Sequence, residues 1–493
     1  MNMRIMGFLL TAASTLCATA ALAGGPEEAV KGGDRSSVDL TVYNQNLSLI
    51  REERTFILPK GLSTVVVPDI PSTIDGTSVH FMSLTDPPSV RVLEQNYQYD
   101  LVSQAKLLER YLGRQVEFMR LDPATNKERA VPGTLLASGY AGTGGLVAEI
   151  EGKVELNPSG RLVLPSLPEG LILKPQLTWM VSSTREGTHK AELSYLAGGL
   201  SWSCTYVALM DDKGSSLDMT GWVTLTNNSG TSFHDAGLKL VAGDVNIVQD
   251  QAMPLYKAMR SDMAAEAGAA QFSQSNLFEY KLYSLQRRTN IGNNETKQVE
   301  LASAHNVKTK KTYVYDGLVD QWRTWWNNSS YRSQESFGQQ SNTKVGVYVA
   351  FKNEEKSGLG IALPKGKVRV YERDEEGKEQ FVGEDQIDHT PKDENVRLFL
   401  GNAFDLVGER VQKDFKSYGN GRIVEETIEI TMRNHKDETV AAEVYEHPWR
   451  WSQWEIVTAS DAWTKVDQST LKFPVTLPKD GEKKVRYTIR YSW

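Results

Sequence analysis

The sequence predicts a mainly β protein, made of several antiparallel β-sandwich or barrel units within one exported chain. Alternation of apolar and polar side chains recurs along most of its length, and near the start it places Val38, Leu40 and Val42 on one face. Polar turn residues interrupt this alternation about every ten residues, which is typical of antiparallel sandwiches. The N-terminal stretch has the features of a leader for export.

Residues 1–23 predict a secretory signal peptide. One basic residue, Arg4, precedes an apolar run that ends in Ala-Leu-Ala at 21–23, the small-x-small pattern that signal peptidase cleaves. A leucine stands before Cys17 where a lipoprotein signal needs a small residue, so we assign Cys17 to the apolar run. We therefore expect a mature chain that begins at Gly24 and is located in the periplasm or cell envelope of a bacterium.

The composition argues against a nucleic-acid partner and against a transmembrane helix in the mature chain. The 62 acidic and 55 basic residues form no long block of either sign, so the chain lacks the basic patch that nucleic acid requires. No apolar stretch after the leader is long enough to span a bilayer as a helix. Cleavage leaves Cys204 as the single cysteine, which cannot form an intramolecular disulfide, so burial of a core must stabilise the fold.

The N-terminal part of the mature chain predicts a lead and one β unit. Residues 24–37 are glycine-rich and polar and predict a flexible lead. An N-terminal β unit follows at 38–172, with one short helix near 101–112 that has Asp100 as its N-cap and Gly113 as its end. The short, closely spaced strand patterns after this helix predict a small barrel or sheet.

Strand patterns then continue to the end of the chain. We predict a central β domain at 173–417, interrupted by surface insertions near 252–275 and 321–342, and an immunoglobulin-like β-sandwich at 418–493. Two segments share the pattern of alternating strand, asparagine, polar turn and strand: "DMTGWVTLTNNSGTS" and "VEETIEITMRNHKDET". This similarity indicates two related sandwich modules.

The stretch "GGLSWSC" at 198–204 raises the question of a nucleophile. It lacks the second glycine of a nucleophile elbow, and no helix pattern follows to supply the donors of an oxyanion hole. The residues beside Cys204 offer no positive charge that would favour a thiolate. We therefore predict that Cys204 is a small buried thiol on a strand, preceded by a glycine bulge.

The best candidate for chemistry is the acidic turn "GEDQIDHTPKDE" at 383–394. It offers oxygen and nitrogen ligands for a metal, or a carboxylate and imidazole pair for general acid-base catalysis, above all in Asp385, Asp388 and His389. It lacks the spacing of a calcium loop and a second histidine at the spacing of a zinc site. A turn capped by aspartate side chains explains the same residues, and we predict neither a cofactor nor a metal.

Tryptophan is unusually frequent towards the C-terminus. Eight of the eleven tryptophans lie after residue 320, and Trp322, Trp325 and Trp326 fall within the polar insertion. Large aromatic side chains left in water usually mark an interaction patch, so we predict that these three form a contact surface for an envelope protein or glycan. The alternative is that they fold back and cover an open sheet edge.

Several motifs in order resemble a known family. They are "SYLAGGLSWSCTYVALM", "GWVTLTNNSGTSF", "LKLVAGDVN", "ETKQVEL", "GLGIALPKGKVRVYERDEEG", "FVGEDQIDHTPKDENVRL" and "LGNAFDLVGER". Over roughly residues 190–493 the chain resembles bacterial domain of unknown function 4139. The resemblance implies a secreted or envelope-associated, predominantly β protein, and some relatives are linked by name to suppression of mucoid colony growth. It implies no catalytic residues, and Cys204 departs from the family pattern.

These observations favour an exported envelope protein that acts by binding or scaffolding. A first alternative is a periplasmic hydrolase or metal-dependent enzyme that works through Asp388 and His389, which requires the two side chains to converge in a cleft with a further polar group. A second alternative is an outer-membrane-associated β protein, prompted by the alternating aromatic and aliphatic residues at the C-terminus. The sequence predicts neither the identity of the partner nor the oligomeric state.

Overall fold

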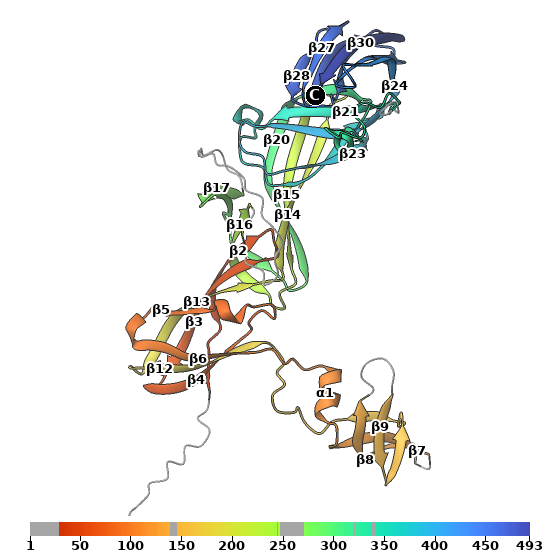
Figure 1. The fold of residues 1–493 in the computed structure, drawn as a ribbon. Coiled ribbons are helices and arrows are strands. Elements are labelled where there is room, and N and C mark those ends of the chain that lie inside the picture. Colours follow the sequence, from red (N-terminus) through yellow and green to blue (C-terminus); the bar gives the residue numbers. More distant parts are fainter. Residues whose placement is uncertain are drawn as a thin grey trace, which may run out of the picture. The chain divides into compact units, whose positions relative to one another are not determined.

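The computed structural model describes residues 29–123, 125–138, 145–243, 245–246, 271–319, 321–336 and 341–493. The predicted signal peptide and most of the insertion near 252–275 lie outside these residues. Strands make up most of the described chain, and only two short α-helices occur in it, so the mainly β fold class is confirmed (Figure 1). No helix among the described residues is long and apolar enough to cross a membrane.

The chain forms two compact units rather than the three predicted. Within the described residues, the N-terminal unit comprises 29–36, Glu53–Ser72 and His80–Leu193, and the C-terminal unit comprises Ser37–Glu52, Thr73–Val79 and the described part of Ser194–Trp493. Three strands contribute residues to both units: β2 (Arg35–Tyr43), β3 (Ser48–Leu58) and β13 (Gly187–Ala197).

The N-terminal unit contains two sheets of its own, with strand orders β1-β4-β12-β6 and β10-β9-β8-β7-β11. Their strands are β1 (Val30–Lys31), β4 (Gly61–Pro68), β6 (Val90–Gln98), β7 (Gln115–Asp122), β8 (Lys127–Ser138), β9 (Leu146–Ile150), β10 (Lys153–Leu156), β11 (Arg161–Val163) and β12 (Gln176–Ser183). A further strand, β5 (His80–Ser83), pairs with β13.

The predicted flexible lead is structured where the structure describes it. Val30 and Lys31 pair in parallel with β4, and β2 begins at Arg35. The glycines that suggested flexibility allow close backbone contact instead: a Cβ atom on Gly33 would lie 2.5 Å from the carbonyl oxygen of Thr55. Glycine thus serves here for close approach, which sequence composition alone does not distinguish from mobility.

The predicted helix is shorter than expected and has a different cap. Helix α1 spans Gln104–Arg110, and Ser103 caps it by accepting a hydrogen bond from the backbone N–H of Lys106 at 3.3 Å. Asp100 instead forms ion pairs with Lys106 and Arg110. Gly113 follows the helix with φ of +72°, as a helix end requires.

The five-stranded sheet curls around its own core. Its inner face packs Phe118, Leu135 and Ile150 against Tyr111 at the end of α1. An ion pair of 2.6 Å joins Arg120 on β7 to Glu155 on β10, although two strands separate β7 from β10 in the sheet. The predicted small β unit after the helix is therefore a curled sheet.

The C-terminal unit is built around a long, continuous sheet. Its main path is β23-β22-β14-β15-β20-β21-β24-β25-β30-β27, and β26, β28 and β29 extend it from β20. The strands after β13 are β14 (Leu200–Met210), β15 (Ser216–Asn227), β16 (Phe233–Ala242), β17 (Phe272–Leu277), β18 (Tyr280–Leu285), β19 (Thr289–Ile291), β20 (Glu295–Asp316), β21 (Lys344–Lys352), β22 (Gly366–Arg373), β23 (Glu379–Ile387), β24 (Asn395–Tyr418), β25 (Ile423–Asn434), β26 (Val440–Glu446), β27 (Trp454–Ala459), β28 (Thr464–Asp467), β29 (Thr470–Leu477) and β30 (Gly481–Ser492). Helix α2 spans Gln321–Trp325.

Strands β24, β25, β30 and β27 pack against β26, β29 and β28 as a β-sandwich, which we call the C-terminal sandwich. Its core contains residues from well before the predicted boundary at 418, including Tyr315 of β20, Val345 of β21 and Leu406 of β24. Because β20 and β24 have 22 and 24 residues, each runs from the preceding part of the sheet into this sandwich. A boundary drawn at a turn in the sequence therefore cuts through one core.

A buried asparagine follows or ends a strand at three places. Asn227, Asn353 and Asn434 are each at most 1% exposed, and each side-chain amide donates hydrogen bonds to at least two backbone carbonyl groups. The sequence shows this pattern at Asn227 and Asn434, and the structure adds Asn353 in "VAFKNEEKSG". The repeated turn supports related modules within the C-terminal unit.

Candidate functional site

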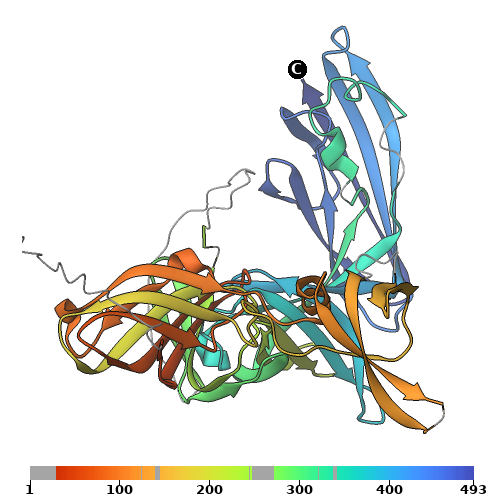
Figure 2. The ribbon, with the colours of Figure 1, turned by 90° about the horizontal axis from the view of Figure 1, so that it is seen from below.

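The insertion near 321–342 lies against the C-terminal sandwich. We call its described part, residues 321–336, the strap. Figure 2 shows its helix α2 beside the blue strands of the sandwich. Leu318, Trp322 and Trp449 form a small buried core here, and Trp325 and Tyr331 pack against it.

The three strap tryptophans do not share one environment, so the prediction that all three are exposed is wrong. Trp322 is 9% exposed, and Trp325 is half-buried with its ring 5.5 Å from that of Trp449. Only Trp326 is exposed, at 40%. The polar neighbours that suggested a surface loop lie on the outer side of the strap. The indoles of Trp322 and Trp325 point inward and pack against Trp449, which is more than one hundred residues away in the sequence.

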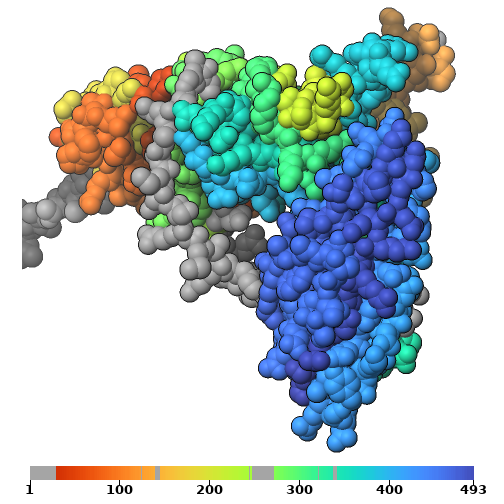
Figure 3. Space-filling view, turned by 90° about the horizontal axis from the view of Figure 1, so that it is seen from above, coloured from red at the N-terminus to blue at the C-terminus, as the bar shows by residue number. Residues whose placement is uncertain are grey.

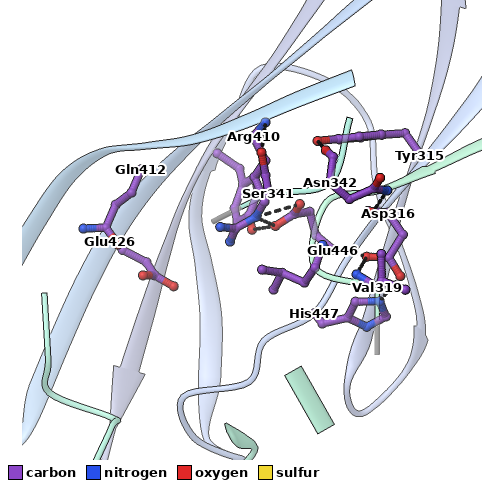
Figure 4. A network of polar contacts seen from close by, with 12 residues as sticks. Tyr315, Asp316, Val319, Ser341, Asn342, Arg410, Gln412, Glu426, Glu446 and His447 are labelled. Atoms are coloured by element: carbon purple, nitrogen blue, oxygen red, sulfur yellow. Dashed lines mark hydrogen bonds and ion pairs between the residues drawn. The ribbon is translucent and has the colours of Figure 1, made fainter. Parts of the chain in front are cut away.

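A histidine anchors the start of this region. His447 is 8% exposed, with Nε2 at 3.1 Å from Asp316 Oδ2 and Nδ1 at 3.0 Å from the carbonyl oxygen of Ser469. Asp316 also accepts hydrogen bonds from the backbone N–H groups of Leu318 and Val319 through Oδ1 (Figure 4). Because both ring nitrogens face acceptors, the geometry favours the doubly protonated imidazolium.

The pKa of His447 agrees with this geometry. Burial acts to lower the pKa of the imidazole, but the hydrogen bond and the negative charge of Asp316 outweigh it and raise the pKa above the usual value. A catalytic histidine must present one nitrogen to a substrate. Since Asp316 and Ser469 occupy both nitrogens of His447, this pair holds structure in place rather than transferring protons.

Two buried ion pairs lie behind the strap. Arg410 donates from Nε to both carboxylate oxygens of Glu446 at 2.9 and 3.1 Å, as Figure 4 shows, and the hydroxyl of Tyr487 also donates to Glu446. Arg450 donates from Nε to Glu426 at 2.9 Å. All four charged side chains are at most 3% exposed. Each buried charge therefore has a partner of opposite sign, which such burial requires.

Arg450 links the second ion pair to the strap. Its Nη1 donates to the backbone carbonyl groups of Tyr331, Arg332 and Gln334 at 2.9 to 3.3 Å. The guanidinium of Arg332 in turn lies 4.8 Å from the ring of Trp451 and 4.6 Å from that of Trp493. Planar guanidinium groups suit both roles, because they donate several hydrogen bonds and stack on aromatic faces. The strap is thus fixed at both of its ends.

The sequence carries a signal for these ion pairs. Glu426 alternates in phase with Val424 and Ile428, and Arg410 is in phase with Leu406, so each charge falls on the apolar face of its strand. A charge in an inward position predicts a buried partner. The identity of that partner depends on how distant parts of the chain come together, which the local pattern does not show.

The residues of the acidic turn do not converge. Asp385 lies in β23, where Oδ2 accepts a hydrogen bond from the backbone N–H of Phe399 at 2.7 Å. The side chain of Asp388 is 90% exposed, and Nδ1 of His389 accepts a hydrogen bond from the backbone N–H of Lys365 at 3.1 Å. No group of three or more histidine, cysteine, aspartate or glutamate side chains in the described residues is placed to hold a metal ion. These residues fit the structural interpretation of the turn.

Cys204 is a buried residue of β14, as predicted. It is 2% exposed, and burial raises the pKa of its thiol to about 12. The glycines before it form a corner between β13 and β14 rather than a bulge. Gly199 has φ of +77°, and a Cβ atom there would lie 2.7 Å from Cα of Ser229, so the corner requires glycine.

No protein-family model matches the chain, and no curated protein matches it.

Proposed function

We propose that this protein is exported to the bacterial envelope and acts there as a binding or scaffolding protein, with a contact surface on the strap centred on Trp326. The observation that carries the proposal is the contrast between the anchored strap and the exposed indole that it displays. Trp326 is 40% exposed, and its ring lies 6.5 Å from that of the buried Trp322 in an edge-to-face arrangement.

The anchoring of the strap affects binding affinity, because the conformational entropy that a surface loses on binding reduces the affinity. Flexible loops lose conformational entropy on binding, whereas a residue held in place beforehand loses little. Arg450 and His447 hold the strap from behind, and Arg323 stacks 5.5 Å from the ring of Trp322 on its helix. Tryptophan and arginine are the residues most often found at the energetic centre of protein interfaces.

The proposed setting rests on the sequence. The leader pattern at 1–23 supports export, and the ordered motifs over roughly 190–493 support membership of the domain of unknown function 4139 family. Terminal sequencing of the purified protein should give Gly24 as the first residue, and the protein should be released with the periplasmic fraction. Retention of Met1, or extraction by detergent alone, would contradict this part of the proposal.

A photo-crosslinking amino acid at position 326 tests the contact surface in living cells. Position 463 provides a matched control, because Trp463 is exposed to a similar degree, 37%, and lies outside the strap. We expect one discrete adduct from position 326 and none from 463, and loss of binding of the purified partner by Trp326→Ala but not by Trp463→Ala. Equal adducts from both positions, or full binding by Trp326→Ala, would show that the strap is not the contact surface.

A further inference from the structure

A second feature of the C-terminal unit lies at the tip of the β14–β15 hairpin. A surface cavity of about 330 Å³ is lined by Leu209, Met210, Asp211, Asp212, Ser216, Leu217, Asp218 and Arg373. Its volume is at the lower end of the range of about 300–1,000 Å³ for small-molecule sites. In Figure 3 the yellow-green tip of this hairpin lies at the molecular surface.

The apolar part of the cavity is continuous with the core. Met210 and Leu217 pair across the hairpin and are at most 4% exposed, so both belong to the core. Leu209 lies beside them on the opposite, half-buried face of β14. The cavity therefore has an apolar floor.

The polar part of the cavity has both acceptors and a donor. Burial acts to raise the pKa of Asp211, but hydrogen bonds from Ser215 and Ser216 lower it to about 2 and occupy its oxygens. Asp212 is exposed and accepts no hydrogen bond from any residue that the structure describes. Arg373 is 61% exposed, and its one ion pair with a residue that the structure describes is a loose contact of 3.9 Å with Glu379. Asp212 and Arg373 thus keep hydrogen-bonding capacity for a ligand.

Aromatic side chains continue this surface across the sheet. Strand pairing places Asp218, Leu209, Tyr371 and Phe381 side by side on β15, β14, β22 and β23. The rings of Tyr371 and Phe381 lie 5.7 Å apart, and Phe381 is 55% exposed. Adjacent strands are about 4.8 Å apart, so the row is roughly 14 Å long. That is longer than one sugar ring.

We infer that this cavity and row bind a neutral oligosaccharide. Sugars carry hydroxyl groups around an apolar face of C–H bonds, and this surface offers the complement of both. Asp212 accepts from hydroxyl groups, Arg373 donates to ring and hydroxyl oxygens, and Leu209, Tyr371 and Phe381 cover the C–H face. The site is separate from the strap and does not depend on the contact surface there.

The charge of the lining selects among sugars. Three aspartates face one arginine, so an acidic sugar or a phosphate would meet net repulsion. An isolated metal ion is also disfavoured, since the oxygens of Asp211 are already occupied and Asp218 accepts a hydrogen bond from the backbone N–H of Asn306 at 2.8 Å. We therefore expect uncharged hexose oligomers to bind better than uronic acid oligomers of the same length.

The test screens the purified mature protein by saturation-transfer NMR against neutral and uronic acid oligosaccharides of two to four units, at millimolar concentration. The best neutral ligand is then titrated against Asp212→Asn and Phe381→Ala. Each variant should weaken binding about tenfold or more, as the loss of a charged hydrogen bond or an aromatic contact does. Phe404→Ala is the matched control, because Phe404 is 96% exposed on β24 outside the row and its removal should leave binding unchanged.

Trp326→Ala should also retain sugar binding, which separates this inference from the function proposed for the strap. The inference fails if no neutral oligosaccharide gives saturation transfer, if uronic acid oligomers bind as well as neutral ones, or if Phe381→Ala binds like the unaltered protein. It also fails if Phe404→Ala weakens binding as much as Phe381→Ala does.

Discussion

The imidazole of His447 lies flat against the indole of Trp322, with ring centroids 4.3 Å apart and planes inclined by 9°. His447 follows β26, whereas Trp322 belongs to α2 of the strap, so this stack joins two segments that are distant in the sequence. Asp316 faces the edge of the same imidazole at 3.1 Å. The charge of His447 attracts the carboxylate of Asp316 at the edge of the imidazole and the indole of Trp322 on its face. Both contacts help to hold the strap in position.

Stability should fall with rising pH through the titration of His447. The folded-state pKa is raised above the unfolded value of about 6.5, so the contribution is fully present below pH 6.5. It is lost as pH rises through the folded-state pKa, when the imidazole keeps one N–H for its two acceptors, Asp316 and the carbonyl oxygen of Ser469, and its charge no longer attracts Asp316, Glu446 and Asp467. Melting temperatures measured from pH 5 to pH 10 should show this step.

His447→Gln provides the control for that step, because an uncharged amide can donate to Asp316 but does not titrate. The difference in melting temperature between the unaltered protein and this variant should depend on pH. A constant difference across the range would show that His447 does not change its charge there.

The ion pair of Arg410 and Glu446 should show strong coupling. Glu446→Leu leaves a fully buried guanidinium without its carboxylate, and we expect the free energy of unfolding to fall by about 3–5 kcal/mol. The double variant Arg410→Met with Glu446→Leu removes both charges and should lose less than the single variant. Denaturant unfolding followed by tryptophan fluorescence measures both, since eight of the eleven tryptophans lie after residue 320. A double variant that is less stable than Glu446→Leu alone would contradict the prediction.

The fold class was predictable because alternation and turn residues are local signals. The buried thiol of Cys204 followed from the same alternation, and the structural role of the acidic turn was one of its two interpretations. The boundaries of the units could not be predicted from turn residues, because β20 and β24 are long strands that each run through two parts of the same sheet. Local patterns do not reveal how far a strand continues beyond its first pairing.

The strap shows the limit of local reasoning at the candidate site. Polar neighbours suggested that Trp322 was exposed, yet it is buried by His447 and by Trp449, more than one hundred residues away in the chain. The partners of the inward charges are likewise distant: Glu446, the partner of Arg410, lies on β26, and Arg450, the partner of Glu426, lies in the segment after β26. Such contacts depend on strand order, which alternation does not encode.

Asn227 should be far more important for stability than its neighbour Asn228. Asn227→Ala removes a side chain that donates to the carbonyl groups of Thr231 and Gly292 and accepts from Ser229, so we expect a loss of roughly 1–3 kcal/mol. Asn228→Ala changes the same residue type at an exposed position and should be close to neutral. Thermal unfolding of the two variants provides the comparison, and equal losses would contradict a structural role for the buried amide.

The acidic turn should tolerate removal of its chemical groups. Asp388→Ala combined with His389→Ala leaves the hydrogen bonds of Asp385 intact and should lower the stability by about 1 kcal/mol or less. Metal content measured by mass spectrometry and hydrolysis of generic ester and phosphate substrates should be the same in both proteins. Stoichiometric metal that disappears in the double variant would restore the enzymatic alternative.

Single substitutions in the strap should separate its two sides. Trp322→Ala removes a 9% exposed indole that packs on His447 and Trp449, and the transfer and cavity costs together predict a loss of about 3–5 kcal/mol. Trp326→Ala removes an indole that is already 40% exposed, so its melting temperature should stay close to that of the unaltered protein. Hydrogen exchange provides the second measurement. Trp322→Ala should expose the backbone of α2 to faster exchange, because this end of the strap then loses its stack on His447 while Arg450 still holds the other end, whereas Trp326→Ala should leave that protection unchanged. A large loss of stability in Trp326→Ala, or a neutral effect of Trp322→Ala, would reverse the assignment of the inner and outer faces of the strap.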